Sequence, residues 1–373
     1  MANEGLGQAR AAKNDEFYTQ YQDIEKEISA YLDFDPNVFR GKTLLLPCDD
    51  PEWSNFTKFF AQKFQELGLK KLVSTSYAPN SKPSDISYQP TLFETESPKF
   101  DGIKTQTNGK IFTLTQDTSG DGLINVEDLE WGYLKGDGDF RSDEVKELRD
   151  ESDIIITNPP FSLFREFLSW LTEADKEFVI IGNMNAITYK EVFPLVMKNK
   201  IWIGATNFNV GMFFFVPDNF IYADTYKFDK EVDGKKASRV PGVCWYTTID
   251  HGRRHQPLAL MTESDNVKFS RHKEVRGIGY KEYANYDGIE VPFVDSIPSD
   301  YKGFMGVPIS FLNKYNPDQF EIIGSSGELG FQISKVANPG TYQQGGPSFY
   351  VENSDGTYTR LYKRLVIKHK ETK

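Results

Sequence analysis

Runs of consecutive apolar residues alternate with amphipathic stretches along the first half of the chain. The runs are short and bounded by turn-forming residues, which is typical of buried strands. They lie at 42–47, 69–75, 154–157, 178–181, 201–203 and 211–216. Helical spacing of apolar residues follows two of the runs, over 56–64 and over 162–171. Strands that alternate with helices predict an α/β fold with a doubly wound parallel sheet.

Two parts of the chain depart from that pattern. Residues 78–135 are polar and rich in Gly, Pro, Ser and Asp, so they are predicted to form an inserted loop region. Beyond about residue 218 the helical spacing fades, and aromatic segments separated by glycine and proline replace it. We therefore expect a first domain over 1–220, which contains the insertion, and a mostly β region over 221–373.

Residues 153–164 form the most informative stretch. A β-branched run ends in Asn158-Pro159-Pro160-Phe161, and a helix-like segment follows. Ligands of open α/β sheets bind at the carboxyl ends of strands, where this turn is expected to lie. Each proline fixes its own φ and pushes the preceding residue into extended geometry, which holds the carbonyls of Asn158 and Pro159 outward as acceptors. A proline-terminated strand with a core phenylalanine is the structural alternative, and the flanking strand and helix weaken it.

These groups suit the activation of an aromatic amine. The lone pair of such an amine is delocalised, so two acceptors that hold its two hydrogens would help it to attack a methyl donor without a strong base. The Phe161 ring could stack on a base flipped out of a duplex, which contributes roughly 1–3 kcal/mol against an unstacking cost of a few kcal/mol. The turn therefore fits methyl transfer to an amino group of a base.

The tetrapeptide resembles the catalytic motif of S-adenosylmethionine-dependent methyltransferases that act on amino groups, and residues 157–167 resemble the EcoRI-type adenine-specific DNA methyltransferases in particular. Further segments resemble that family in the same order, at 15–21, 48–51, 54–56, 136–142, 187–192 and 305–312. The resemblance implies a Rossmann-like methyltransferase sheet and methyl transfer to N6 of adenine in a specific duplex DNA sequence, by base flipping, as in restriction-modification. It assigns the catalytic role to Asn158, Pro159, Pro160 and Phe161.

The same resemblance implies which residues bind S-adenosylmethionine. They are Tyr18, Thr19, Cys48, Asp49, Asp50, Asp139, Phe140 and Asn158. The loop at 47–51 is acidic and lacks the glycine-rich turn of most such enzymes, although an acidic turn is what the EcoRI-type pattern has there. A solvated turn is the alternative for this loop and for 136–139. The strand at 69–75 is followed by no carboxylate, so nothing in the sequence indicates what holds the cofactor ribose.

An acidic loop inside the insertion resembles the calcium loop of EF-hands, in its dockerin form. Oxygen-bearing residues occupy loop positions 1, 3, 5 and 12, and glycine occupies position 6. The ligands of a structural Ca²⁺ would be Asp117, Ser119, Asp121, Leu123 through its carbonyl, and Asp128. Only one copy is present, and an acidic glycine-rich turn needs no metal, so a plain surface turn remains the alternative.

Charge and composition limit the binding partners, metal sites and cellular compartment that fit this sequence. The net charge of −11 is unusual for a DNA-binding protein. Residues 221–373 carry 21 Lys and Arg against 19 Asp and Glu, so the excess of negative charge lies in the first domain. Two cysteines cannot make a disulfide framework, and the four histidines lack zinc-type spacing. No apolar run could cross a bilayer and the first 14 residues lack a signal core, which predicts a cytoplasmic enzyme without a membrane partner.

The resemblance implies that residues 1–220 are catalytic and that 221–373 form the target-recognition region for double-stranded DNA. Arginines that could contact guanine edges or phosphates are Arg253, Arg254, Arg271 and Arg276. A cognate restriction endonuclease could share the recognised site. Two alternatives stay open: a methyltransferase that acts on a protein glutamine amide or on RNA, and a non-enzymatic, calcium-stabilised interaction module. The large C-terminal region favours DNA, because sequence readout of a duplex needs extra surface.

Overall fold

The computed structural model describes residues 18–49, 54–78, 95, 97–206, 211–215, 230–232, 235–240, 242–343 and 347–370. The chain divides into two compact units. The first consists of Met1–Val196 and Ile201–His251, and the second of Met197–Lys200 and Gly252–Lys373. The boundary predicted near residue 220 itself lies outside the described residues.

A mixed sheet of eight strands forms the centre of the first unit, in the order β5-β4-β3-β2-β6-β7-β12-β8. Its four central strands run parallel: β3 (Lys71–Thr75), β2 (Thr43–Leu46), β6 (Ile154–Thr157) and β7 (Glu177–Asn183). The flanking strands are antiparallel: β5 (Glu130–Tyr133), β4 (Lys110–Leu114), β12 (Val243–Thr247) and β8 (Trp202–Ile203). The predicted α/β architecture is thus confirmed, but the sheet is mixed, whereas a parallel sheet was predicted.

Two of the edge strands, β4 and β5, come from the segment predicted as a loop insertion. The residues of β4 alternate between buried and half-buried, which is the pattern of a strand with one face toward the core. In a polar, glycine-rich surrounding this short alternation is easily missed. The insertion therefore extends the sheet at one edge, and it also carries the acidic loop between β4 and β5.

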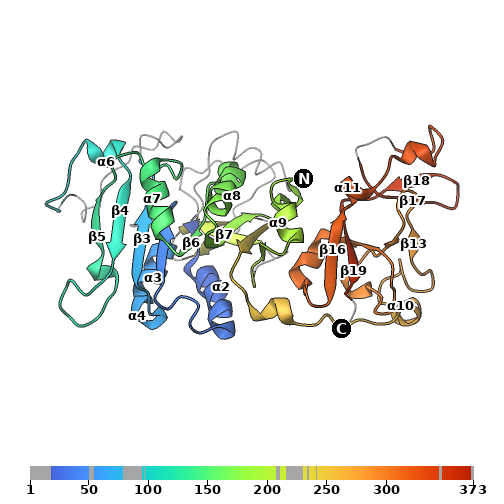
Figure 1. Cartoon of the computed structure of the whole chain (residues 1–373), viewed down its shortest axis with the longest axis horizontal. Helices are drawn as coiled ribbons and strands as arrows, with labels where there is room; N and C mark the ends of the chain where they lie inside the picture. Colours follow the sequence, from blue (N-terminus) through green and yellow to red (C-terminus); the bar gives the residue numbers. More distant parts are fainter. Residues whose placement is uncertain are drawn as a thin grey trace. The chain divides into compact units, whose positions relative to one another are not determined.

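Helices cover both faces of the central strands (Figure 1). Leu44 and Leu46 of β2 join a core cluster with residues of α2 (Tyr21–Phe34) and α3 (Asn55–Gln62), whereas Leu45 between them is buried on the opposite face. That opposite face is covered by α7 (Asp143–Glu151) and α8 (Phe164–Glu173). There the Phe164 ring packs on Tyr246 of β12, with ring centroids 5.3 Å apart.

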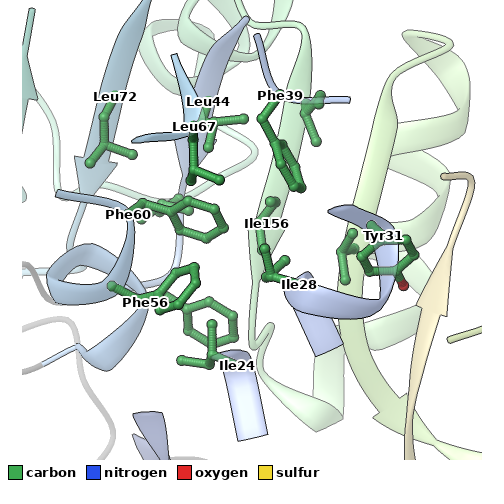
Figure 2. Close-up of a cluster of buried hydrophobic side chains, with 14 of the residues drawn as sticks. Ile24, Ile28, Tyr31, Phe39, Leu44, Phe56, Phe60, Leu67, Leu72 and Ile156 are labelled. Atoms are coloured by element: carbon green, nitrogen blue, oxygen red, sulfur yellow. The ribbon is translucent and has the colours of Figure 1, made fainter. Parts of the chain in front are cut away.

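Aromatic and branched side chains from α2 and α3 fill the first of these layers, as Figure 2 shows. Ile24 and Ile28 of α2 and Phe56 and Phe60 of α3 gather around Ile156 of the central strand. All of these side chains are fully buried. Burial of each one contributes about 1.5–3 kcal/mol relative to exposure, so this layer fixes the sheet from which the functional loops project.

A second, four-stranded antiparallel sheet also belongs to the first unit, in the order β1-β9-β11-β10. Its strands are β1 (Tyr18–Thr19), β9 (Met212–Phe215), β11 (Lys235–Val240) and β10 (Lys230–Val232). Short elements complete the described part of the unit: α4 (Phe64–Leu67), α6 (Lys104–Thr107), α9 (Phe193–Met197), η2 (Val126–Asp128), η3 (Phe161–Leu163) and η4 (Met184–Thr188).

The second unit is built mainly from strands and short helical turns. A five-stranded sheet has the order β13-β14-β15-β19-β16, with β13 (Lys281–Glu282), β14 (Ile289–Glu290), β15 (Met305–Pro308), β19 (Arg364–His369) and β16 (Phe320–Ser325). A separate hairpin joins β17 (Tyr350–Glu352) and β18 (Tyr358–Arg360). The helices are α10 (Glu263–Phe269), α11 (Ser326–Leu329), η5 (Gly252–His255), η6 (Val294–Ser296), η7 (Ile309–Lys314) and η8 (Ile333–Lys335). Across the described ranges of both units, none of the helices is long and apolar enough to cross a membrane.

Candidate active site

The Asn-Pro-Pro-Phe turn lies at the carboxyl end of β6, between β2 and β7 in the middle of the sheet. Pro159 is buried, whereas Asn158 and Phe161 are half-buried. The carbonyl of Pro160 accepts a 2.9 Å hydrogen bond from the Leu163 N–H, which starts the short η3 turn before α8. Strand, stiff turn and helix follow one another as the sequence predicts, so Asn158 and Phe161 are placed at the edge where α/β sheets bind ligands.

A hydrogen-bond network ties the loop after β2 to the end of β6. The Thr157 hydroxyl donates to one oxygen of the Asp49 carboxylate at 2.6 Å, and the Ser54 hydroxyl donates to the other at 2.8 Å. The Ser74 hydroxyl of β3 donates to the Asp49 carbonyl oxygen at 3.1 Å. Asp49 is only 6% exposed. Three neighbouring strand ends are therefore joined through this one residue, which sequence analysis assigned to the cofactor.

Acidic groups gather around these strand ends. Burial raises the pKa of the Cys48 thiol well above its ordinary value, and the nearby carboxylates of Asp49 and Asp139 raise it further. Burial also raises the pKa of Tyr77 after β3, with the carboxylates of Asp137 and Asp139 adding to the effect. These couplings place three of the predicted cofactor residues, Cys48, Asp49 and Asp139, in one region. A thiol with a raised pKa stays protonated at neutral pH, which makes Cys48 a poor nucleophile.

Asp139 is held in a charged pair. The Arg141 guanidinium donates to both of its carboxylate oxygens, at 2.9 and 2.6 Å, and these hydrogen bonds lower the pKa of Asp139. Arg141 also donates to Glu166 of α8 at 3.1 Å. Phe140 is 4% exposed, and its ring packs against Phe167 at 5.1 Å and Trp170 at 5.7 Å. Its ring therefore belongs to the packing of α8, and a contact with cofactor stays a prediction.

The N-terminal strand β1 lies beside the Asn-Pro-Pro-Phe turn. Thr19 pairs with Phe214 of β9, and the Phe214 ring meets the Phe161 ring edge to face, with centroids 6.3 Å apart. The Asn55 side chain at the start of α3 donates to the Thr19 carbonyl at 2.8 Å. Thr19 thus joins the same region as the turn, as the family resemblance implies. The Tyr18 side chain and Asp50 lie outside what the structure describes.

A buried carboxylate that sequence analysis missed anchors the segment leading to β9. Glu27 of α2 accepts hydrogen bonds from the Ala205 and Thr206 N–H groups, both at 2.8 Å, and from the hydroxyls of Tyr31 at 2.6 Å and Thr206 at 2.5 Å. Burial raises the pKa of Glu27, and these donors act in the opposite direction. Its position could have given a signal, because it falls among the apolar-spaced residues Ile24, Ile28 and Tyr31 of an otherwise amphipathic helix.

The structure does not support the predicted calcium site. The Asp117 carboxylate accepts from the N–H groups of Gly120 and Gly122, at 2.6 and 2.8 Å. The Asp128 carboxylate accepts from the N–H groups of Thr118, Ser119 and Asn125, and these bonds, the last most of all, lower its pKa to about 2. Among the described residues, which include the whole loop with Ser119, Asp121 and Leu123, no group of three or more metal-binding side chains gathers. The loop's own amides occupy the oxygens that the pattern assigned to a cation.

A mixed α/β sheet with an Asn-Pro-Pro-Phe turn at the end of a central strand is consistent with a Rossmann-like methyltransferase. A family model described as adenine-specific methyltransferase EcoRI matches residues 5–370. The chain belongs to this family, so the resemblance drawn from its motifs is confirmed and the protein is an enzyme. The alternative of a non-enzymatic interaction module is therefore wrong.

Two relatives illustrate the family. The type II methyltransferase M.EcoRI of Escherichia coli is 39% identical over 322 residues, which cover 86% of this chain and 89% of M.EcoRI. The type II methyltransferase M.MpnI of Mycoplasma pneumoniae is 35% identical over 98% of both chains. A search of solved structures found no significant match.

Proposed function

We propose that this enzyme transfers a methyl group from S-adenosylmethionine to the N6 amine of adenine in a specific duplex DNA sequence. The observation that carries the proposal is the position of the Asn-Pro-Pro-Phe turn, at the carboxyl end of β6 and joined to the loop after β2 through Thr157 and Asp49. The names of the relatives, all type II methyltransferases, support it. In a restriction-modification setting the methyl mark would protect the site from an endonuclease that cuts the same sequence.

The residues of the turn would have separate roles in binding the target adenine. The Asn158 side-chain oxygen and the Pro159 carbonyl would each accept one N6 hydrogen, which directs the nitrogen lone pair toward the donor. Phe161 would stack on the extruded adenine, with Phe214 behind it as a fixed support. When bound, S-adenosylmethionine supplies an electrophilic methyl group. Because the amine needs orientation more than deprotonation, no strong general base is required beside it.

The polar groups around β1 fit the cofactor. Thr19 Oγ1 and Gln20 Nε2 are buried, and neither atom has a hydrogen-bond partner among the described residues. Buried polar atoms normally have partners, so two such atoms beside the catalytic turn suit a polar ligand such as the amino-acid end of S-adenosylmethionine. We assign the cofactor to Tyr18, Thr19, the acidic loop after β2, Asp139 and Asn158, in a doubly wound Rossmann-like arrangement.

The second unit would read the DNA. Its residues carry 18 Lys and Arg against 14 Asp and Glu, so it is the more basic part of an acidic protein. Arg254 is unsuited to base readout, because it is 6% exposed and donates to the Asn199 side chain at 2.6 Å. Arg271 and Arg276 are exposed and remain candidates.

The test is a methylation assay on plasmid DNA with isotopically labelled cofactor, followed by mass spectrometry of the released nucleosides. We expect N6-methyladenine at one short recognition sequence. Total RNA and a glutamine-bearing peptide serve as competing substrates in parallel reactions. Label on either of these in preference to duplex DNA, or on cytosine, would contradict the proposal.

A further inference from the structure

Two large apolar side chains are exposed at the end of α10 and in the turn that follows it. Phe269 is 70% exposed and Ile278 is 66% exposed. The turn folds back on the helix, since the Gly277 N–H donates to the Val267 carbonyl at 2.8 Å. We call the exposed residues of this segment the α10 tip; they are Lys268, Phe269, Arg271, Lys273, Glu274, Arg276, Gly277 and Ile278.

The α10 tip is rigidly built. The His272 ring stacks on Phe293, with centroids 3.7 Å apart and planes 7° apart, and its Nε2 lies 2.8 Å from the Asp295 carboxylate. Arg271 pairs with the other Asp295 oxygen at 2.7 Å. Gly277 has a φ of +77°, a conformation that side-chain-bearing residues rarely adopt. Phe269 and Ile278 are therefore presented by a fixed framework, so binding would cost little ordering entropy.

Charge indicates what this surface meets. Within 268–278 four exposed side chains are cationic and one, Glu274, is acidic. Arg271 is paired with Asp295, so Lys268, Lys273 and Arg276 supply most of the positive charge of the tip. A second copy of the same surface would bring like charges together, which disfavours self-association. Duplex DNA matches both features of the tip. Its phosphates bind cationic side chains, which fix the register of a protein on the duplex, and its grooves expose base edges that are read through contacts that include apolar ones.

We infer that the α10 tip is a DNA-contacting surface of this enzyme: its lysines and arginines contact phosphates, and Phe269 and Ile278 contact base edges in a groove. The inference rests on the proposed function and names the surface that would serve it. Ionic and apolar contacts respond differently to salt. Loss of a phosphate contact lowers the dependence of log affinity on log salt by about one per contact, whereas loss of an apolar contact leaves that slope unchanged.

The experiment measures the affinity of the full-length enzyme for a fluorescent duplex that carries its recognition sequence, over a range of salt concentrations. We expect the double variant Phe269→Ala/Ile278→Ala to bind at least tenfold more weakly with an unchanged salt slope. We expect Lys273→Ala/Arg276→Ala to reduce the slope by about two. Tyr362→Ala is the matched control, because Tyr362 is 90% exposed in the same unit but outside the tip, and it should bind as the parent does.

Parent-like affinity of both double variants would overturn the inference. A parent that sediments as a dimer and a Phe269→Ala/Ile278→Ala variant that sediments as a monomer would also overturn it, in favour of a second copy as the partner. Circular dichroism of each variant identifies any loss of folding, and the single variant Ile278→Ser then replaces a misfolded double variant. Failure of the proposed function is seen separately, since the parent would then leave duplex DNA unmethylated.

Discussion

The Thr157 hydroxyl donates a 2.6 Å hydrogen bond to the buried carboxylate of Asp49, 108 residues away in the chain. Thr157 directly precedes Asn158, so this bond fixes the start of the Asn-Pro-Pro-Phe turn against the loop after β2. We expect Thr157→Val to destabilise the protein by about 1–3 kcal/mol, because a buried carboxylate loses a donor. Urea unfolding measures the cost, and single-turnover kinetics measure methyl transfer.

A double-mutant cycle distinguishes positioning from cofactor binding at Asp49. If Asp49 acts on the turn through Thr157, Asp49→Asn and Thr157→Val will slow methyl transfer non-additively, and Thr157→Val will leave cofactor affinity within several-fold of the parent. Ser54→Ala is the matched control, since Ser54 donates to the other oxygen of the same carboxylate but lies outside β6. Additive losses of rate in the double variant would show that Asp49 does not act on the turn through Thr157.

The Phe161 ring, supported edge-on by buried Phe214, is expected to hold the extruded adenine. Phe161→Ala should weaken stacking by roughly 1–3 kcal/mol, whereas Phe161→Tyr retains a ring and part of the activity. Fluorescence of 2-aminopurine at the target position reports extrusion of the base. An undiminished signal in Phe161→Ala would remove this residue from the stacking role.

We expect substitution of Asp139 to lower cofactor affinity and substitution of Phe140 to lower stability. Asp139→Ala should weaken S-adenosylmethionine binding at least tenfold, equivalent to about 1.4 kcal/mol, as measured by calorimetry. Phe140→Ala should instead cost about 3–5 kcal/mol of stability, because the buried ring is packed against Phe167 and Trp170. If Asp139→Ala bound S-adenosylmethionine as tightly as the parent, the Asp139 carboxylate would pair with Arg141 and have no role in cofactor binding.

Glu27 makes the stability of the protein depend on pH in a defined direction. Burial raises its pKa in the folded state, so the protonated form is favoured on folding and the associated stability is lost as pH rises from the ordinary glutamate range through the raised value. Glu27→Gln should remove that dependence. At neutral pH it should cost about 1–3 kcal/mol, because in either orientation its amide nitrogen faces a backbone N–H of Ala205 or Thr206.

Unfolding free energies of the parent and Glu27→Gln between mildly acidic and neutral pH test this expectation. Glu25→Gln on the exposed side of the same helix is the control, and it should follow the parent. A parallel pH dependence in the parent and Glu27→Gln would show that Glu27 does not titrate in this range.

Local patterns predicted the elements that carry the site. The apolar run at 154–157 coincides with β6, and the helix expected over 162–171 begins as the η3 turn and continues as α8 to Glu173. Such elements depend on residues that are adjacent in sequence, which is why the strand, turn and helix around Asn158 could be recognised. The motif also identified the family, because its residue types are dictated by chemistry.

Contacts between distant segments could not be predicted in this way. The Glu27 carboxylate accepts a hydrogen bond from Ala205, which is 178 residues away in the chain. The sequence around neither residue indicates which residue it contacts. The prediction of a calcium site at 117–128 was wrong for the opposite reason, because there a local pattern was present but has two meanings. Its ligand spacing is also the spacing at which aspartates accept hydrogen bonds from their own glycine-rich turn, so the sequence pattern alone cannot distinguish the two.

The central claim is that the Asn158 side chain holds the target amine more than it holds the cofactor. The most direct measurement compares Asn158→Ala with the parent in single-turnover methylation of duplex DNA and in calorimetric titration with S-adenosylmethionine. We predict a loss of methyl transfer of about a hundredfold or more, as for removal of one preorganised polar contact, with cofactor affinity within several-fold of the parent. Retained methyl transfer, or a loss of cofactor affinity as large as the loss of rate, would contradict it.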